Sequence, residues 1–476
     1  MHRLHHSTSA WRQGILTLTA LFLPFVAHAQ SDDLPVVTRT IAIENARIVQ
    51  SPGRIIKRGT VVLRDGLILS VGKKVTIPFD AKRIDGDSLV VYAGFIDGLS
   101  HAGIPKPEEP KNTDRPDDPG NPPNDVAGIQ PERDARTMLD PADKSVTVLR
   151  NAGFTLAHTV PYGRMLPGTG SFIQLGGKTA DAMVLRDAPA LFAQFVGGRR
   201  VYPATPMGIM AKMRQIYRES DRLHHIEALY LQNPAGVERP VLSSVDQAFF
   251  PVLDGERPIF FYTRSALETY RALRLRHDLG FTLMLGGLNE SFDQMDNLEK
   301  AGVPLFLTLN LPEAPKATAK MKADSVKTLM ASFDSEFRGA TYRDMEAEKR
   351  NLEARQLMSR SRYLRQAAEF HKAGLRFGFS TMEVKPEDIH KNLRAMIENG
   401  LAPDDALAAL TTDAAALLGL SATLGTIEPG KIANLVVTTA PYFEEKAEVK
   451  YVFVDGVKYE VEKKKKPVQK DDNKLK

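Results

Sequence analysis

Five side chains in the central part of the chain could take part in binding or catalysis. His101 follows the buried-type strand run 89–97, and His158 lies within the strand run 154–160. Tyr262 and Arg264 alternate along another strand, so both could face one pocket. Ser380 ends a strand run further on. Imidazole and hydroxyl groups can bind a ligand or exchange a proton, and Arg264 can bind a carboxylate ligand or pair with a neighbouring acid.

Other chemistries are excluded by composition. The 476 residues include no cysteine, which excludes disulfides, thiolate metal sites, cysteine nucleophiles and a lipid-anchored N-terminal cysteine. Residues 163–170 are rich in glycine but lack the Gly-Lys-Ser/Thr sequence of a phosphate-binding loop, so they predict a tight turn.

The elements between residues 89 and 424 predict a barrel. Buried-type strand runs recur there, and helical patterns such as 389–397 and 404–418 separate several of them. This alternation predicts a parallel sheet closed as a TIM-like (β/α)8 barrel, with a doubly wound open sheet as the alternative. The charged stretch 315–373 is expected to be a helical insertion on the barrel.

Short strands lie at both ends of the chain. Alternating runs separated by turn signals occupy residues 36–88, and similar runs occupy residues 425–461. Neither set is long enough to bury a core by itself, so the two are expected to pack together as one composite β-sandwich.

The termini carry further signals. Residues 1–29 have a positive start, an apolar stretch at 14–27 and an Ala-His-Ala cleavage site, which predict a signal peptide and a periplasmic mature protein. The apolar stretch is shorter than the ~20 residues of a membrane-spanning helix, so no membrane association is expected after cleavage. Residues 462–476 form a basic tail without interleaved aromatic residues, which does not favour nucleic-acid binding.

Both ends of the chain resemble a known family. The N-terminal part reads IAIENARIVQSPGRIIKRGTVVLRDGLILSVG and then VVYAGFIDGLSHAG, and the C-terminal part reads NGLAPDDALAALTTDAAALLGLSATLGTIEPGKIANLVVT. These segments resemble amidohydrolase-superfamily proteins of the imidazolonepropionase-like type. The resemblance implies a β/α barrel with a β-sandwich built from both termini.

The resemblance also implies a metal site, and this sequence departs from it. Such enzymes use one or two divalent cations, often zinc, to make hydroxide from water near neutral pH. Their first strand reads Asp-x-His-x-His, where this chain has Asp97, Leu99 and His101. A His is expected near Tyr262 or Arg264 and another at Gly287, and the last strand lacks its Asp. His101 is therefore the single matched ligand, a vestigial one, and about three are normal for catalytic zinc.

Two functions remain open from the sequence. The first is an exported, non-catalytic amidohydrolase-like protein without a cofactor, which binds a ligand or supports a catalytically intact amidohydrolase relative. Its pocket would be lined by His101, His158, Tyr262, Arg264 and Ser380. The alternative is a metal-dependent hydrolase of C–N or peptide amide bonds, with a rearranged site that uses His101, His158 and either Glu290 or Glu383.

Overall fold

The computed structural model describes residues 39–108, 116–236, 238–313 and 340–461. The predicted signal peptide, the basic tail and the first part of the expected helical insertion lie outside the described residues. The described chain is mixed α/β, with two eight-stranded sheets. No helix within the described ranges has both the length and the apolar character needed to cross a bilayer.

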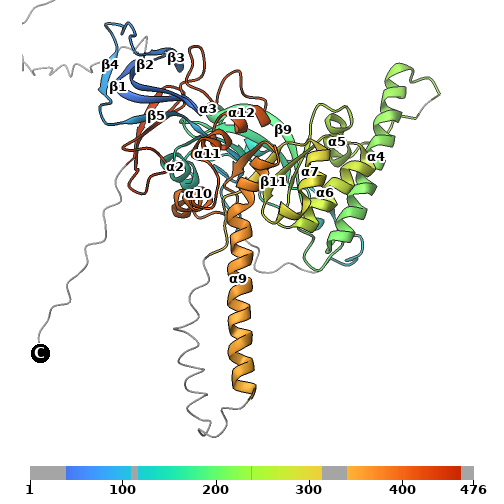
Figure 1. The fold of residues 1–476 in the computed structure, drawn as a ribbon. Coiled ribbons are helices and arrows are strands. Elements are labelled where there is room, and N and C mark those ends of the chain that lie inside the picture. The colour runs from blue at the N-terminus through green and yellow to red at the C-terminus, as the bar shows by residue number, and fades with distance from the viewer. Residues whose placement is uncertain (1–38, 109–115, 237, 314–339, 462–476) are drawn as a thin grey trace, which may run out of the picture. The chain divides into compact units, whose positions relative to one another are not determined.

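Strands from both ends of the chain form the first sheet, which we call the end sheet. Its order is β16-β15-β14-β5-β1-β2-β3, with β4 beside β1. Blue N-terminal strands and red C-terminal strands lie together in Figure 1, where β5 pairs antiparallel with β14. The strands are β1 (Thr40–Ser51), β2 (Arg54–Arg64), β3 (Leu67–Gly72), β4 (Lys82–Asp85), β5 (Val90–Ala93), β14 (Leu435–Thr438), β15 (Val449–Val454) and β16 (Val457–Glu460).

The strands from the two chain ends form one sheet, and its boundary with the barrel differs from the predicted one. The run 89–97 was expected as a single barrel strand, but β5 belongs to the end sheet and β6 (Phe95–Ser100) begins the barrel. Gly94 separates the two strands. A larger residue does not fit there, because an added Cβ would lie 2.2 Å from Thr155 Oγ1. The end sheet therefore reaches Ala93, beyond the expected limit at residue 88.

The second sheet is a nearly closed barrel, as expected from the strand runs. Its order is β13-β12-β11-β10-β9-β8-β7-β6. The remaining strands are β7 (Phe154–Thr159), β8 (Gly168–Gln174), β9 (Val184–Gln194), β10 (Ile259–Tyr262), β11 (Leu283–Leu288), β12 (Leu305–Thr308) and β13 (Phe377–Ser380). The expectation of an all-parallel sheet is wrong at one position, because β8 runs antiparallel to both β7 and β9.

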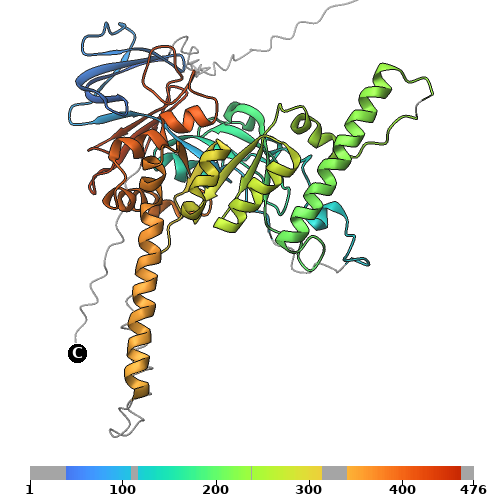
Figure 2. The ribbon, with the colours of Figure 1, turned by 45° about the vertical axis from the view of Figure 1, so that its right-hand side comes forward.

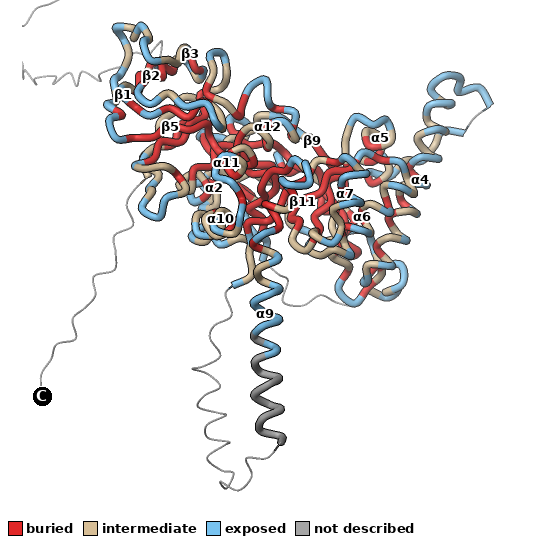
Figure 3. The backbone as a smooth tube through the Cα atoms, viewed as in Figure 1, coloured by how far each residue is buried: buried red, intermediate tan, exposed pale blue. Residues whose placement is uncertain are grey.

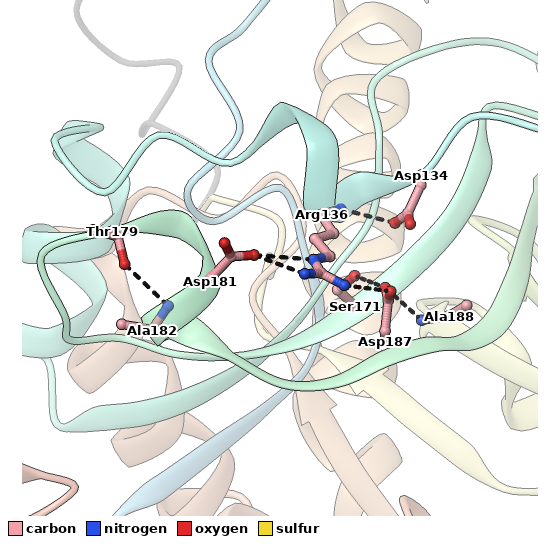
Figure 4. Close-up of polar contacts among 8 residues, drawn as sticks. All are labelled: Asp134, Arg136, Ser171, Thr179, Asp181, Ala182, Asp187 and Ala188. Carbon is pink, nitrogen blue, oxygen red and sulfur yellow. Dashed lines mark hydrogen bonds and ion pairs between the residues drawn. The ribbon is translucent and has the colours of Figure 1, made fainter.

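A surface ion-pair network holds the β8–β9 hairpin. Arg136 lies in the short 3-10 helix η1 (Ala135–Met138), and its guanidinium binds Asp181 Oδ1 at 2.8 Å and Asp187 Oδ2 at 3.4 Å. Figure 4 shows Asp187 also accepting a hydrogen bond from Ser171 on β8, at 3.2 Å. These groups satisfy one another, which indicates a structural role for the network.

Helices cover the outer side of the barrel. In Figures 1 and 2, α4 to α7 lie together beside the strands β9 to β11. The α-helices are α1 (Asn124–Ala127), α2 (Lys144–Asn151), α3 (Ala180–Met183), α4 (Pro206–Gln232), α5 (Ser244–Leu253), α6 (Ala266–Leu279), α7 (Met295–Ala301), α9 (Ala340–Lys372), α10 (Ile389–Glu398), α11 (Pro403–Leu410) and α12 (Thr412–Leu417). The described part of the expected insertion is thus the single helix α9, which begins at Ala340.

One predicted helix is two helices in the structure. The stretch 404–418 was expected as a single helix, but α11 and α12 are separated by Thr411, whose φ of −131° and ψ of −86° are not helical. The Thr411 hydroxyl donates to the Leu407 carbonyl at 2.6 Å. A threonine that bonds the carbonyl of the preceding turn tends to bend a helix, and the interruption lies at this residue.

Apolar side chains fill the inside of the barrel. Figure 3 shows the barrel strands as mostly buried. An interior cluster combines residues from strands around the barrel with residues from α12 and the segment after it; it includes Ile96, Leu99, Leu156, Phe172, Phe192, Phe260, Tyr262, Met284, Phe306, Met382 and Leu420. The barrel interior is therefore a packed core, as is normal for this architecture.

Candidate functional site

His101 lies directly after β6 and is held by two contacts. Its Nδ1 donates to the Val160 carbonyl at 2.7 Å, and its ring stacks on Tyr162 with centroids 3.8 Å apart. Burial lowers the pKa of His101 to about 4, although the bond to Val160 opposes this shift. The ring is therefore neutral at pH 7, with Nε2 as its one nitrogen available to accept a bond.

His158 lies on the inner side of β7 among aromatic rings. It is 1% exposed, and its polar contact is a weak one with the Gly98 backbone, outside ordinary hydrogen-bond geometry. The ring stacks on Phe260 with centroids 5.0 Å apart and meets Phe172 edge-on. A Cβ at Gly170 would lie 2.4 Å from Nε2, so the backbone of β8 covers that nitrogen. His158 thus packs inside the barrel and does not reach a surface pocket.

Tyr262 ends β10 and fills the space above Gly287. A Cβ added at Gly287 would lie 2.0 Å from Tyr262 Cε2, and Gly287 has a φ of +68°. The Tyr262 hydroxyl forms a hydrogen bond with Glu383, and burial together with this carboxylate raises its pKa. The position where the resemblance implies a histidine is therefore occupied by a tyrosine ring from the neighbouring strand.

Arg264 and Ser380 are committed to protein partners. The Arg264 guanidinium lies 3.7 Å from Glu268 Oε1, so the pairing with a neighbouring acid is the arrangement observed. Ser380 is 0% exposed, and its hydroxyl donates to the Leu99 carbonyl at 2.8 Å. Ser380 therefore joins β13 to β6 and presents no hydroxyl at a surface.

Sequence reasoning missed the most strongly bonded polar pair at this end of the barrel. Asp97 on β6 is 0% exposed. Its Oδ1 accepts a hydrogen bond from Thr381 N at 2.8 Å, and its Oδ2 accepts one from Thr381 Oγ1 at 2.6 Å. Burial raises the pKa of Asp97 to about 6, against the effect of these donors. Asp97 stands in the resembled Asp-x-His-x-His pattern, but its partner is 284 positions away, which no local signal reveals.

The groups proposed for a rearranged site have separate partners. Glu290 accepts a hydrogen bond from Tyr363 on α9, whereas Glu383 binds Tyr262. His158 is enclosed by Phe260, and His101 is bound to Val160. A cleft of about 660 Å³ lies elsewhere, between α9 and the segment after β12; it is lined by Pro312, Glu313, Leu352, Arg355, Gln356, Ser359, Arg360 and Tyr363.

The donor set does not fit a catalytic divalent cation. Throughout the described ranges, no three His, Asp or Glu side chains come close enough together to hold a metal ion. Around His101 the neighbouring positions carry apolar groups: Leu99 is 0% exposed, and a Cβ at Gly286 would lie 2.8 Å from Leu99 Cδ2. The nitrogen and carboxylate ligands that such a cation requires are not gathered there.

Comparison with known proteins supports the fold and part of the family resemblance. Residues 315–458 match the Amidohydrolase family. The structure is similar to the crystal structure of an amidohydrolase from Thermotoga maritima MSB8, with a TM-score of 0.69 and 22% identity over 88% of this chain and 100% of that one. It is also similar to an uncharacterised protein, with a TM-score of 0.50 and 16% identity over 89% of this chain and all of the other.

No curated protein matches the chain significantly. The matched segment includes α9 to α12, strands β13 to β15 and the first half of β16, so it takes in the last barrel strand and the C-terminal part of the end sheet. Residues 315–458 thus match the Amidohydrolase family, and the barrel fold is similar to that of a crystallised amidohydrolase.

Proposed function

We propose that this protein is an exported, non-catalytic amidohydrolase-fold protein of the imidazolonepropionase-like type, with a degenerate metal site. The observation that carries the proposal is the packing of Tyr262 over Gly287, which fills a ligand position with a protein ring. Leu99 and Arg264 at two further expected positions bring no metal-binding group. Without a cation, water near pH 7 is a poor nucleophile.

Metal analysis of the purified mature protein tests this directly. We expect much less than one equivalent of zinc, manganese or iron, and no increase in melting temperature when zinc is added. Hydrolysis of dipeptides and cyclic amides should stay at the level of a buffer control. A near-equimolar metal that is lost together with activity in His101→Ala would overturn the proposal and favour the rearranged-site hydrolase.

We further propose that the protein supports a separately encoded, catalytically intact amidohydrolase relative in the periplasm. The motivation is the strand run 377–381, which reads FGFST and resembles that of degenerate family barrels fused ahead of an intact one. Cross-linking in intact cells followed by mass spectrometry should recover a partner with a complete His-x-His pair. Recovery of the chain only as a cytoplasmic species that retains residues 1–29 would contradict both the export and the partnership.

A further inference from the structure

The barrel is open at one place in its hydrogen-bonded strand order. This order begins at β13 and ends at β6, and within the described strands no β-ladder joins these two. We call this junction the seam. One backbone bond crosses it, from Met382 N to the Leu99 carbonyl at 3.1 Å. A barrel that lacks a ladder at one junction needs other contacts there, because unpaired strand edges are otherwise exposed.

Side chains supply those contacts at the seam. Asp97 on β6 accepts from both the amide and the hydroxyl of Thr381, at 2.8 and 2.6 Å. One residue earlier, the Ser380 hydroxyl donates to the Leu99 carbonyl at 2.8 Å. All of these groups are buried. Three polar groups therefore cross the seam in a region without solvent, where leaving one unpaired costs more than at a surface.

An aromatic ring closes the inner side of the same junction. A Cβ at Gly98 on β6 would lie 1.9 Å from Phe306 Cδ1, and a Cβ at Gly378 on β13 would lie 2.7 Å from the same atom. A glycine on each side of the seam thus makes room for one Phe306 ring from β12. The ring excludes water from the inner side, which keeps the bonds between Asp97 and Thr381 in an apolar environment.

We propose that Asp97 and Thr381 form a latch that closes the barrel across the seam without a metal ion. The inference rests on the proposed function, because in a barrel without a bound cation the first and last strands must be joined by protein side chains. Asp97 and Thr381 position the two strands and take no part in a reaction. Opening of the latch should expose the seam locally while the end sheet stays folded.

Hydrogen exchange of the full-length mature protein tests the latch. Thr381→Val removes the hydroxyl that donates to Asp97 Oδ2 and leaves the buried carboxylate with one donor fewer. Because charged hydrogen bonds contribute about 1.5–3 kcal/mol, exchange at the Leu309, Thr381 and Met382 amides should become about ten- to a hundred-fold faster. Exchange in β1 to β3 should change much less, which separates local opening from general loss of stability.

Two further variants keep the test decisive. Thr381→Ser retains the hydroxyl and should restore slow exchange. Thr308→Val is the matched control, because Thr308 is the last residue of the neighbouring strand β12 and its hydroxyl accepts a bond from the nearby Asn310 N at 2.9 Å. If Thr381→Val were insoluble while both others folded, the latch would still be supported. Equal exchange in Thr381→Val and Thr308→Val would overturn it.

The latch and the proposed function can fail independently. Metal-free protein with unchanged exchange in Thr381→Val refutes the latch alone. Metal-containing, active protein in which Thr381→Val still opens the seam refutes the non-catalytic function alone. Addition of EDTA to the wild-type protein should leave seam exchange unchanged, and faster exchange with EDTA would show that a cation, not Asp97, holds the junction.

Discussion

Two regions of the barrel bury an ionisable side chain and surround it in opposite ways. At the seam, Asp97 is 0% exposed and accepts from the Thr381 amide and hydroxyl. On the inner wall, His158 is 1% exposed, makes only a weak contact with the Gly98 backbone and stacks on Phe260. The two side chains are buried to a similar extent, so their neighbours determine what each one does. Hydrogen-bond donors let Asp97 join two strands, whereas aromatic rings around His158 make it part of the apolar packing.

The comparison also gives the two groups opposite dependences of stability on pH. Burial raises the pKa of Asp97 to about 6, so its neutral form is favoured in the folded protein, and stability is lost as pH rises through 6. Burial lowers the pKa of His158 to about 3, so stability from this group is present above pH 6.5 and is lost as pH falls toward 3. Single variants separate the two effects.

The largest expected effect belongs to His158→Phe. The variant removes the buried imidazole and keeps an aromatic ring next to Phe260. At pH 4 the His158 imidazole is protonated in the unfolded wild type but stays neutral in the folded protein, and this difference favours unfolding. The free energy of unfolding of the wild type relative to the variant should therefore fall by about 3 kcal/mol between pH 7 and pH 4. Urea unfolding at several pH values measures this.

If the unfolding free energies of His158→Phe and the wild type ran parallel over this pH range, the ring of His158 would be solvated, and the contrast with Asp97 would be lost.

Asp97→Asn should give the opposite slope with a smaller amplitude. Wild-type Asp97 ionises with a cost in the folded protein, whereas the amide does not ionise. The stability of the wild type relative to the variant should therefore fall by about 2 kcal/mol as pH rises from 4 to 7. The same urea series checks this, and a difference between the two proteins that did not vary with pH would show that the pKa of Asp97 is not raised in the folded protein.

Tyr262→Phe tests a residue at the rim of the barrel that combines both kinds of contact, a hydrogen bond and ring packing. The variant loses the hydrogen bond to Glu383 but keeps the ring that covers Gly287. Because the Glu383 side chain can turn to water, the loss should be about 1 kcal/mol at pH 7. Thermal unfolding measures it, and Tyr262→Ala should cost clearly more because the ring itself is removed. Equal losses in the two variants would argue against packing over Gly287.

The smallest effect is expected for Arg264→Ala. Its guanidinium is 45% exposed and lies 3.7 Å from Glu268 Oε1. Exposed ion pairs of this kind contribute roughly 0–1 kcal/mol, so the melting temperature should barely change. A strong loss of ligand or partner binding without loss of stability would instead assign Arg264 to a binding surface.

Much of the fold could be predicted because its signals are local. Buried strand runs and the apolar stripe of Ile389, Leu393 and Met396 mark elements that the structure contains, including α10. The β8–β9 hairpin could not be predicted in this way. Its first strand begins in a glycine-rich run, and its second contains Pro189 next to Ala188, a residue with a φ of +44°. Such residues are typical of turns, so the alternation of apolar and polar residues that marks a strand is not visible in the sequence.

The site was less predictable for a different reason. The sequence indicates which expected ligand positions hold other residues, such as Leu99 and Gly287, but it does not show what occupies the space they leave. Asp97 and Thr381 meet only because the barrel closes, and Tyr262 covers Gly287 only because β10 and β11 are adjacent. Contacts between side chains on different strands depend on the whole barrel.

The Tyr262 ring also limits the order in which this barrel could acquire a histidine at residue 287. A side chain there would begin with a Cβ 2.0 Å from Tyr262 Cε2, on a backbone whose φ of +68° disfavours any residue but glycine. A histidine at 287 therefore cannot come first, since it must follow both the removal of the ring and a change in the local backbone. Substitutions at 262 and 287 are thus coupled, and the effect of either one depends on whether the other is already present.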